Sequence, residues 1–121
     1  MVSAAIMVKD MLDYAGTLDR TFRALADPSR RSILDRLSRG PASVGQLAAP
    51  LPMSLAAVVQ HVQLLESVGL VSTKKVGRVR TCTLQGAPLR AAEKWLGEHR
   101  AVWEARLDRL DAVLRDEGDR V

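Results

Sequence analysis

Basic side chains gather around one glycine in the middle of the chain. Lys74 and Lys75 come shortly before Gly77, and Arg78 and Arg80 follow it. Lysine and arginine pair with the phosphate groups of polyanions, and their concentration at one turn raises the local positive potential. Solvated charges are common on protein surfaces, but a cluster at a turn is more typical of a binding face. We therefore expect a polyanionic partner to contact this turn.

A second set of candidate binding residues lies on the segment 54–68. The side of this segment that faces away from its apolar stripe carries Ser54, Leu55, Ala56, Val59, Gln60 and Gln63. A glutamine amide can pair with the edge of adenine, and a small apolar side chain can contact the methyl group of thymine. If the polyanion is double-stranded DNA, this segment is expected to prefer steps that contain A·T pairs.

Catalytic and metal chemistry have few candidate residues. The chain contains one cysteine, Cys82, and two histidines, His61 and His99. A transition-metal site needs three or four convergent nitrogen, sulfur or oxygen ligands, which no stretch of the sequence supplies. A glycine-rich phosphate loop and a motif that joins serine, histidine and an acid are also absent from the sequence. We expect a protein that is not an enzyme and that holds no metal and no cofactor.

Helix caps and helix breakers divide the first half of the chain. Asp27-Pro28 is typical of a helix start, because the carboxylate can cap the first turn and proline lacks the N–H that would have no partner there. Ser43 and Gln46 have the spacing of a capping box, and Pro50 ends the short helix that follows. The inward faces of these helices are expected to contain Ile33, Leu34, Leu37, Val44 and Leu47.

The middle of the chain predicts a helix and then a hairpin. Helical spacing relates Val58, Val62, Leu65 and Val68. Gly69 is suited to a left-handed C-terminal cap of this helix, which covers 54–68. Runs rich in valine and threonine on either side of Gly77 predict a β-hairpin over 70–84.

The C-terminal part of the chain predicts one long helix over 88–117. Its apolar residues recur every three or four positions, and the helix is longer than one small domain can cover. We expect the exposed part of this stripe to meet a second copy of the chain through Leu96, His99, Trp103, Leu107, Leu110 and Leu114. Trp95 and Trp103 are expected to fill the dimer core, with the wall of a ligand pocket as the alternative.

Length and charge indicate one compact domain with a basic middle. The chain has 121 residues and a net charge of +4. Residues 17–42 carry six arginines against three aspartates, and residues 54–85 carry four basic residues against one glutamate, so each segment nets +3. A single cysteine, and a start that resembles neither a signal peptide nor a membrane span, favour a cytoplasmic protein that does not bind membranes.

The predicted order of elements is that of a winged helix-turn-helix. The fold class is mainly α-helical with a small β-hairpin wing and a long C-terminal dimerisation helix. Helix 54–68 is expected to enter the major groove of DNA, while the 70–84 wing contacts the backbone or the minor groove. Arg30 and Arg31 are expected either to touch phosphates or to be solvated. We divide the single domain, 1–121, into an N-terminal extension (1–16), a DNA-binding core (17–85) and the C-terminal helix (86–121). Gly16-Thr17 is expected to separate a helix in the extension from the first helix of the core.

Three stretches resemble the ArsR/SmtB family of bacterial winged-helix repressors: TFRALADPSRRSILDRLSRGPASVGQLA, MSLAAVVQHVQLLESVGLV and GRVRTCTL. The C-terminal stretch, with Trp95 and Trp103, is similar to a branch of that family that lacks the metal-binding motifs. The resemblance covers residues 18–115. It implies a homodimer that binds a double-stranded DNA operator and represses transcription. The sequence leaves open whether a small-molecule inducer is a further partner.

Two features depart from the family pattern. Val59 and Gln60 precede His61, where the family commonly has serine and then a basic residue, so direct base contacts are reduced. The stretch SVGQLA lacks the paired cysteines of the family's metal sensors, and the C-terminal helix offers only His99, with Glu98 on a different face. The second departure agrees with the absence of a metal site.

Single residues also have plain structural interpretations. We expect His61 to be a partly buried, hydrogen-bonded histidine, although its position leaves a phosphate contact open. We expect His99 to be a hydrogen-bonded histidine of the dimer interface. Cys82 is interpreted as structural, because a redox role requires exposure of the thiol.

The alternative function is a winged-helix module that binds a protein surface without sequence-specific DNA binding. It rests on the exposed face of 54–68, which is poor in charge and carries Leu55, Ala56 and Val59. The salt dependence of duplex binding distinguishes the two hypotheses. A protein that reads DNA loses affinity steeply as the salt concentration rises, whereas a protein-interaction module shows little or no duplex binding at moderate salt.

Overall fold

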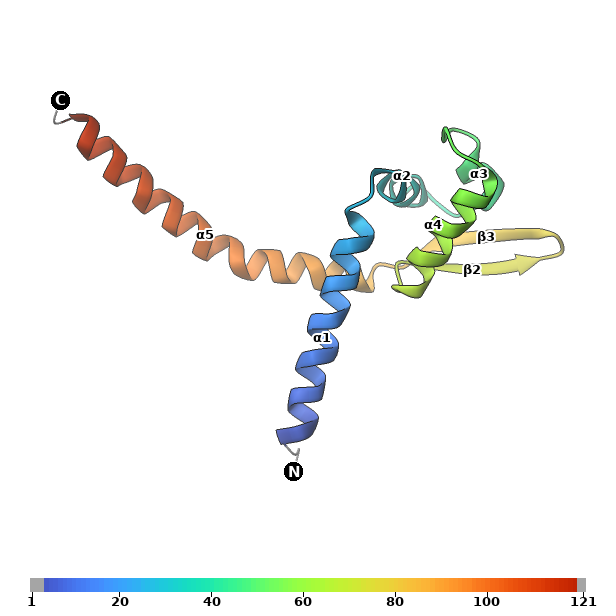
Figure 1. Cartoon of the computed structure of the whole chain (residues 1–121), viewed down its shortest axis with the longest axis horizontal. Coiled ribbons are helices and arrows are strands. Elements are labelled where there is room, and N and C mark those ends of the chain that lie inside the picture. The colour runs from blue at the N-terminus through green and yellow to red at the C-terminus, as the bar shows by residue number, and fades with distance from the viewer. Residues whose placement is uncertain (1–3, 120–121) are drawn as a thin grey trace.

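The protein is a small helical body from which one long helix and one hairpin project. The computed structural model describes the backbone of residues 4–119 and the side chains of residues 13–118. Its elements are α1 (Ala4–Leu25), α2 (Pro28–Leu37), β1 (Ala42–Ser43), α3 (Val44–Ala48), α4 (Leu55–Ser67), β2 (Val71–Val76), β3 (Val79–Leu84) and α5 (Ala87–Asp119). α5 extends to one side and the β2–β3 hairpin to the other, and α1 crosses the beginning of α5 (Figure 1). The mainly helical winged helix-turn-helix predicted from the sequence is confirmed.

The helix boundaries follow the predicted caps. The carboxylate of Asp27 accepts a backbone N–H of the first turn of α2 at 2.9 Å. Ser43 and Gln46 form a reciprocal capping box on α3, and the hydroxyl of Ser54 accepts a backbone N–H at the start of α4 at 3.1 Å. Gly69 follows α4 with a φ of 84°, which favours glycine. Each cap satisfies backbone groups that a helix end otherwise leaves without a partner.

The predicted break at Gly16-Thr17 is wrong, because α1 is continuous from Ala4 to Leu25. One glycine lowers helix stability by about 1 kcal/mol relative to alanine but does not end a helix. The hydroxyls of Thr17 and Thr21 donate to backbone carbonyls one turn earlier, which keeps these polar groups within the helix. Leu18 and Thr21 are buried, so tertiary packing holds this part of α1 in place.

The wing belongs to a three-stranded antiparallel sheet with the order β1-β3-β2. The hairpin agrees with the prediction, and Val76 and Val79 face each other across its tip. β1 was not predicted, because a strand of two residues has no recognisable periodicity. It pairs with β3 through Ala42, which lies opposite Cys82, and so attaches the wing to the start of α3.

The core lies beneath α4 and against the base of the wing. Its fully buried side chains include Ile33, Leu47, Val58, Val62, Leu65, Leu70, Val71 and Cys82. The predicted inward residues Leu34 and Leu37 are buried too, and Val44 and Val68 pack against the core while partly exposed. The core therefore fixes α4 relative to the wing.

Cys82 is expected to be unreactive in the folded protein. Its side chain has no exposed surface, and burial raises the pKa of the thiol, so little thiolate forms near neutral pH. A thiol reagent such as Ellman's reagent should react slowly with the native protein and rapidly in concentrated urea. Cys82→Ala should be tolerated better than Cys82→Ser, because a buried hydroxyl without a partner costs about 1–3 kcal/mol. A native rate equal to that of a peptide thiol would contradict the buried position.

Asp27 should make the stability of the protein depend on pH in the acidic range. The hydrogen bond from the Arg30 N–H holds the pKa of Asp27 below its ordinary value, and the positive charges of Arg30 and His61 act in the same direction. A lowered folded pKa means that the stabilisation is present above the ordinary carboxyl pKa and is lost as the pH falls through the folded pKa. Asp27→Ala should therefore lower Tm at pH 7, and the difference from the unmodified protein should shrink toward pH 3.

The matched control is Asp19→Ala, since Asp19 is an exposed carboxylate in the interior of α1 rather than at a cap. Thermal unfolding followed by circular dichroism at both pH values measures the effect. A Tm difference for Asp27→Ala that stayed constant from pH 7 to pH 3 would show that the charge of the cap contributes nothing.

Candidate nucleic-acid interface

α4 presents a polar face because its apolar face is committed to the core. Val58, Val62 and Leu65 are fully buried, which fixes the rotation of the helix about its axis. The predicted contact residues Ala56, Gln60 and Gln63 are consequently exposed, and Ser54 is exposed at the N-terminal cap. Leu55 is 56% exposed, while Val59 is partly buried. The structure thus places the polar side of α4 at the surface, as the sequence predicts.

A groove of about 450 Å³ separates this helix from the wing. Its lining residues come from α3, α4 and β3 with the turn before it: Val44, Gly45, Leu55, Val59, Gln63, Arg78 and Arg80. Leu55, Val59 and Gln63 follow one another at four-residue spacing and therefore form one row along α4. The groove brings this row together with two wing arginines. Sequence reasoning missed Val44 and Gly45, because only the tertiary contact of α3 with the wing places them there.

The wing carries the predicted cations at the surface. Lys74, Lys75, Arg78 and Arg80 are all exposed, and none forms an ion pair with another described residue. The antiparallel register sets Lys75 directly opposite Arg80. Like charges in facing positions destabilise a β-pair, so this arrangement does not serve the fold. Gly77 turns the chain at the tip with a φ of 62°.

Arg30 and Arg31 have a structural role that the sequence did not indicate. Arg30 donates from Nε to the carbonyl of Ala24 at 2.9 Å and from a terminal nitrogen to the carbonyl of Arg23 at 3.0 Å. Arg31 donates to the carbonyl of Leu25 at 2.8 Å. The last carbonyls of a helix lack partners within the helix and carry partial negative charge. The two arginines therefore clamp the end of α1 to the start of α2.

The histidines differ in their surroundings. His61 is partly buried as predicted, but no hydrogen bond joins it to another described residue. His99 meets the carbonyl of Trp95 at 2.8 Å through Nδ1 and stacks on the Trp95 ring at 4.1 Å between centroids. Phe22 of α1 and Trp103 pack edge-on against Trp95, each at 5.9 Å. This aromatic cluster joins α1 to α5.

The second half of α5 lies outside the core. The predicted interface residues Leu96, Trp103, Leu107, Leu110 and Leu114 are 43% to 63% exposed, and His99 is partly exposed. They continue the stripe that begins with the buried Ala92, where α5 packs on the rest of the domain. One apolar stripe is thus covered at its start and bare along the rest.

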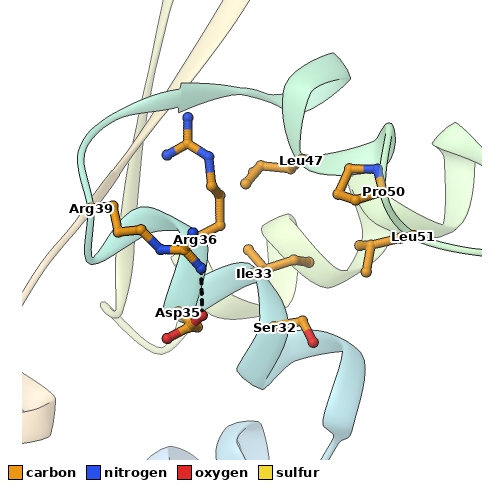
Figure 2. A pocket seen from close by; sticks show the side chains of 8 residues that line it. All are labelled: Ser32, Ile33, Asp35, Arg36, Arg39, Leu47, Pro50 and Leu51. Carbon is orange, nitrogen blue, oxygen red and sulfur yellow. Dashed lines mark hydrogen bonds and ion pairs between the residues drawn. The ribbon is translucent and has the colours of Figure 1, made fainter.

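A second hollow of about 400 Å³ lies between α2 and α3 with the turns that follow them, and Figure 2 shows the side chains that line it. Ile33, Leu47 and Leu51 form its apolar floor, and Arg39 pairs with Asp35 at its edge at 2.8 Å. Within the described residues, no group of three or more histidine, cysteine or acidic side chains is placed to hold a metal ion. No described helix is long and apolar enough to cross a membrane.

Comparison with known proteins gives the same fold and a family. Residues 25–73 match a family described as a helix-turn-helix domain. The chain is 38% identical over 101 residues to the HTH-type transcriptional regulator Rv2034 of Mycobacterium tuberculosis. The aligned region covers 84% of this chain and 92% of that protein.

Solved structures are similar as well. The ArsR family transcriptional regulator RHA00566 has 48% sequence identity and a TM-score of 0.71, covering 74% of this chain and 93% of that one. The homodimeric winged helix-turn-helix DNA-binding domain Mb0332 of Mycobacterium bovis has 25% identity and a TM-score of 0.59, covering 90% of this chain and 95% of that one. The chain therefore belongs to the ArsR family of winged helix-turn-helix transcriptional regulators.

Proposed function

We propose that the protein is a homodimeric repressor that binds a DNA operator with sequence specificity. The observation that carries this proposal is the wing, where Lys75 and Arg80 face each other without an acidic partner among the described residues. A polyanion that binds at the wing would neutralise these cations and remove their mutual repulsion. The groove beside the wing offers base-reading groups at the same place, which distinguishes a DNA reader from a general anion binder.

In the proposed complex, α4 lies in the major groove and the wing follows the adjacent backbone. Major-groove edges differ among the base pairs, so Gln60 and Gln63 can read adenine, and Leu55, Ala56 and Val59 can contact thymine methyl groups. We assign phosphate or minor-groove contacts to the wing, with further phosphate contacts by Ser54 and by the α2 arginines. The basic residues assigned to these phosphate or minor-groove contacts are Arg30, Arg31, Lys74, Lys75, Arg78 and Arg80.

Dimerisation is assigned to the exposed stripe of α5. Exposing apolar side chains to water along several turns of one helix is unfavourable, and burying them lowers the free energy. The relative Mb0332 is described as a homodimeric DNA-binding domain. In the proposed dimer the stripes of two α5 helices cover each other, and each copy presents one α4 to successive major grooves of the operator.

Selection of duplexes from a random pool tests the function directly. The expected result is a set of related sequences that contain two half-sites, since a twofold dimer reads a site of matching symmetry. Affinity for the selected duplex should fall linearly on a log-log plot against salt concentration. Absence of duplex binding at moderate salt would support the protein-interaction module instead. The regulated genes then follow from matches to the selected sequence.

Arg78→Ala should weaken binding to many duplexes and lower the salt slope by about one unit, because one phosphate contact is lost. Fluorescence anisotropy at several salt concentrations measures both quantities. Arg109→Ala is the matched control, since Arg109 is exposed on α5 and distant in the fold from the wing. An unchanged slope for Arg78→Ala would remove the wing tip from the proposed interface.

Gln60→Ala should act differently, because its amide carries no charge and reads a base. The expected loss is roughly 1–3 kcal/mol on the selected operator, with a much smaller loss on random DNA and little change in salt slope. Competition between the two duplexes measures this difference. Equal weakening of all duplexes by Gln60→Ala, together with no effect of Arg78→Ala, would overturn the proposed docking.

The protein should sediment as a dimer at micromolar concentration. Replacing both Leu107 and Leu110 by glutamine should raise the dimer Kd by about 100-fold or more, because each buried leucine contributes about 1.5–3 kcal/mol. The control replaces the exposed Arg106 and Arg109 of the same turns by glutamine and should leave Kd nearly unchanged. A stable, folded monomer of the unmodified protein at micromolar concentration would contradict this interface.

A further inference from the structure

A cavity of about 220 Å³ lies where three helices meet, on the flank of α4 away from the wing. Its floor is apolar and consists of Ala24 from α1 with Leu64 and Val68 from the end of α4. Leu64 is 40% exposed, so the floor is open to the surface. Covering an exposed leucine beside a hollow with an apolar group removes apolar surface from water and so lowers the free energy.

The rim of this cavity is strongly basic. Arg20 and Arg23 from α1 and Arg30 from α2 line it, and no acidic side chain does. None of the three forms an ion pair with another described residue, although the charge of Arg30 acts on the capping carboxylate of Asp27. An apolar floor with an all-arginine rim is complementary to an amphipathic anion.

Arg30 is already fixed in position for such a contact. Two of its N–H groups donate to the carbonyls of Arg23 and Ala24, which holds the guanidinium at the cavity. A guanidinium has five N–H donors, so three remain for an anion. Little side-chain entropy is lost when a fixed arginine binds, and charge-assisted hydrogen bonds are stronger than neutral ones.

The cavity shares Arg30 with the proposed phosphate contacts, but its lining has no residue in common with the groove beside the wing. Leu64 follows Leu55 by nine positions, about two and a half helical turns, so the two leucines point to opposite sides of α4. Leu55 lines the groove with the wing, and Leu64 lines the cavity with α1 and α2. DNA held by the wing therefore does not need to cover this cavity.

We propose that the cavity binds a small organic anion with a short apolar chain. Its carboxylate or phosphate is bound by Arg20, Arg23 and Arg30, and its apolar part lies on Leu64 and Val68. The volume is below the roughly 300–1,000 Å³ of pockets for drug-sized ligands, so the ligand is small. Because the ligand touches α1 and α4 at once, it biases the orientation of the recognition helix. This last step rests on the proposed function, whereas binding itself does not.

Octanoate is a suitable ligand for the test, with octan-1-ol as its neutral counterpart. The full chain, labelled with ¹⁵N, is titrated without DNA and followed by amide chemical shifts. We expect saturable shifts that are largest at the end of α1, the start of α2 and the end of α4, and at least tenfold weaker binding of octan-1-ol. Shifts that do not saturate, or equal binding of both compounds, would overturn the proposal.

Matched variants separate this cavity from other surfaces. Arg23→Gln and Leu64→Ser should each weaken octanoate binding about tenfold. Leu55→Ser on the opposite flank of α4, and Arg39→Gln at the hollow of Figure 2, should leave it unchanged. Loss of binding in either control but not in the cavity variants would refute this location. Shifts that depend on protein concentration alone, with no octanoate effect, would show that a second copy fills the cavity.

The regulatory step is measured separately with the selected operator. Saturating octanoate should change the duplex Kd of the unmodified protein by at least threefold and that of Leu64→Ser much less. Binding of octanoate without any change in duplex Kd would refute the regulatory step and leave the ligand site intact. Failure of the protein to bind any duplex would refute the proposed function but not the cavity.

Discussion

The side chains of Val58, Val62 and Leu65 of α4 are buried in the hydrophobic core, together with Leu47 of α3 and Leu70 before the wing. This contact fixes the rotation of α4, and with it the identity of every side chain that the helix offers to a partner. Turning α4 by one residue would bury Val59 and expose Val58. The wing depends on the same contact, because Val71 at its base belongs to the core. One buried face therefore sets both the stability of the domain and the set of side chains that α4 exposes.

The wing shows the opposite relation between stability and function. Lys75 and Arg80 repel each other across the hairpin, and the strand pair must be held by interactions elsewhere. Cys82 in the core and the pairing of Ala42 with β3 supply them at the base of the sheet. The charged tip can then extend away from the core without deciding whether the domain folds.

Local signals allowed most of the fold to be predicted, because caps and apolar spacing act within a few residues. Asp27, Ser43, Ser54 and Gly69 mark helix ends in the sequence and do so in the structure. The failures involve interactions between distant segments. Tertiary packing carries α1 through Gly16, and pairing with β3 creates β1.

The candidate site shows the same division. The exposed row on α4 and the wing cations could be predicted, since helical spacing and clustering place them at the surface. The role of Arg30 as a clamp on α1 could not, because its acceptors belong to a different helix and carry no side-chain signal. The groove residues Val44 and Gly45 were missed for the same reason, since they become neighbours of the wing only in three dimensions.

Six charged side chains of α5 form pairs within the helix, between Lys94 and Glu98, Arg100 and Glu104, and Asp111 and Arg115. These exposed pairs contribute little to stability and are screened by salt, whereas the hydrophobic contact proposed for the stripe beside them is not weakened by salt. The two ends of the proposed assembly therefore respond differently to ionic strength. In the proposed dimer, rising salt would detach the wing from a polyanion and leave the α5 contact closed, so the two copies would leave DNA together and could bind again without reassembly.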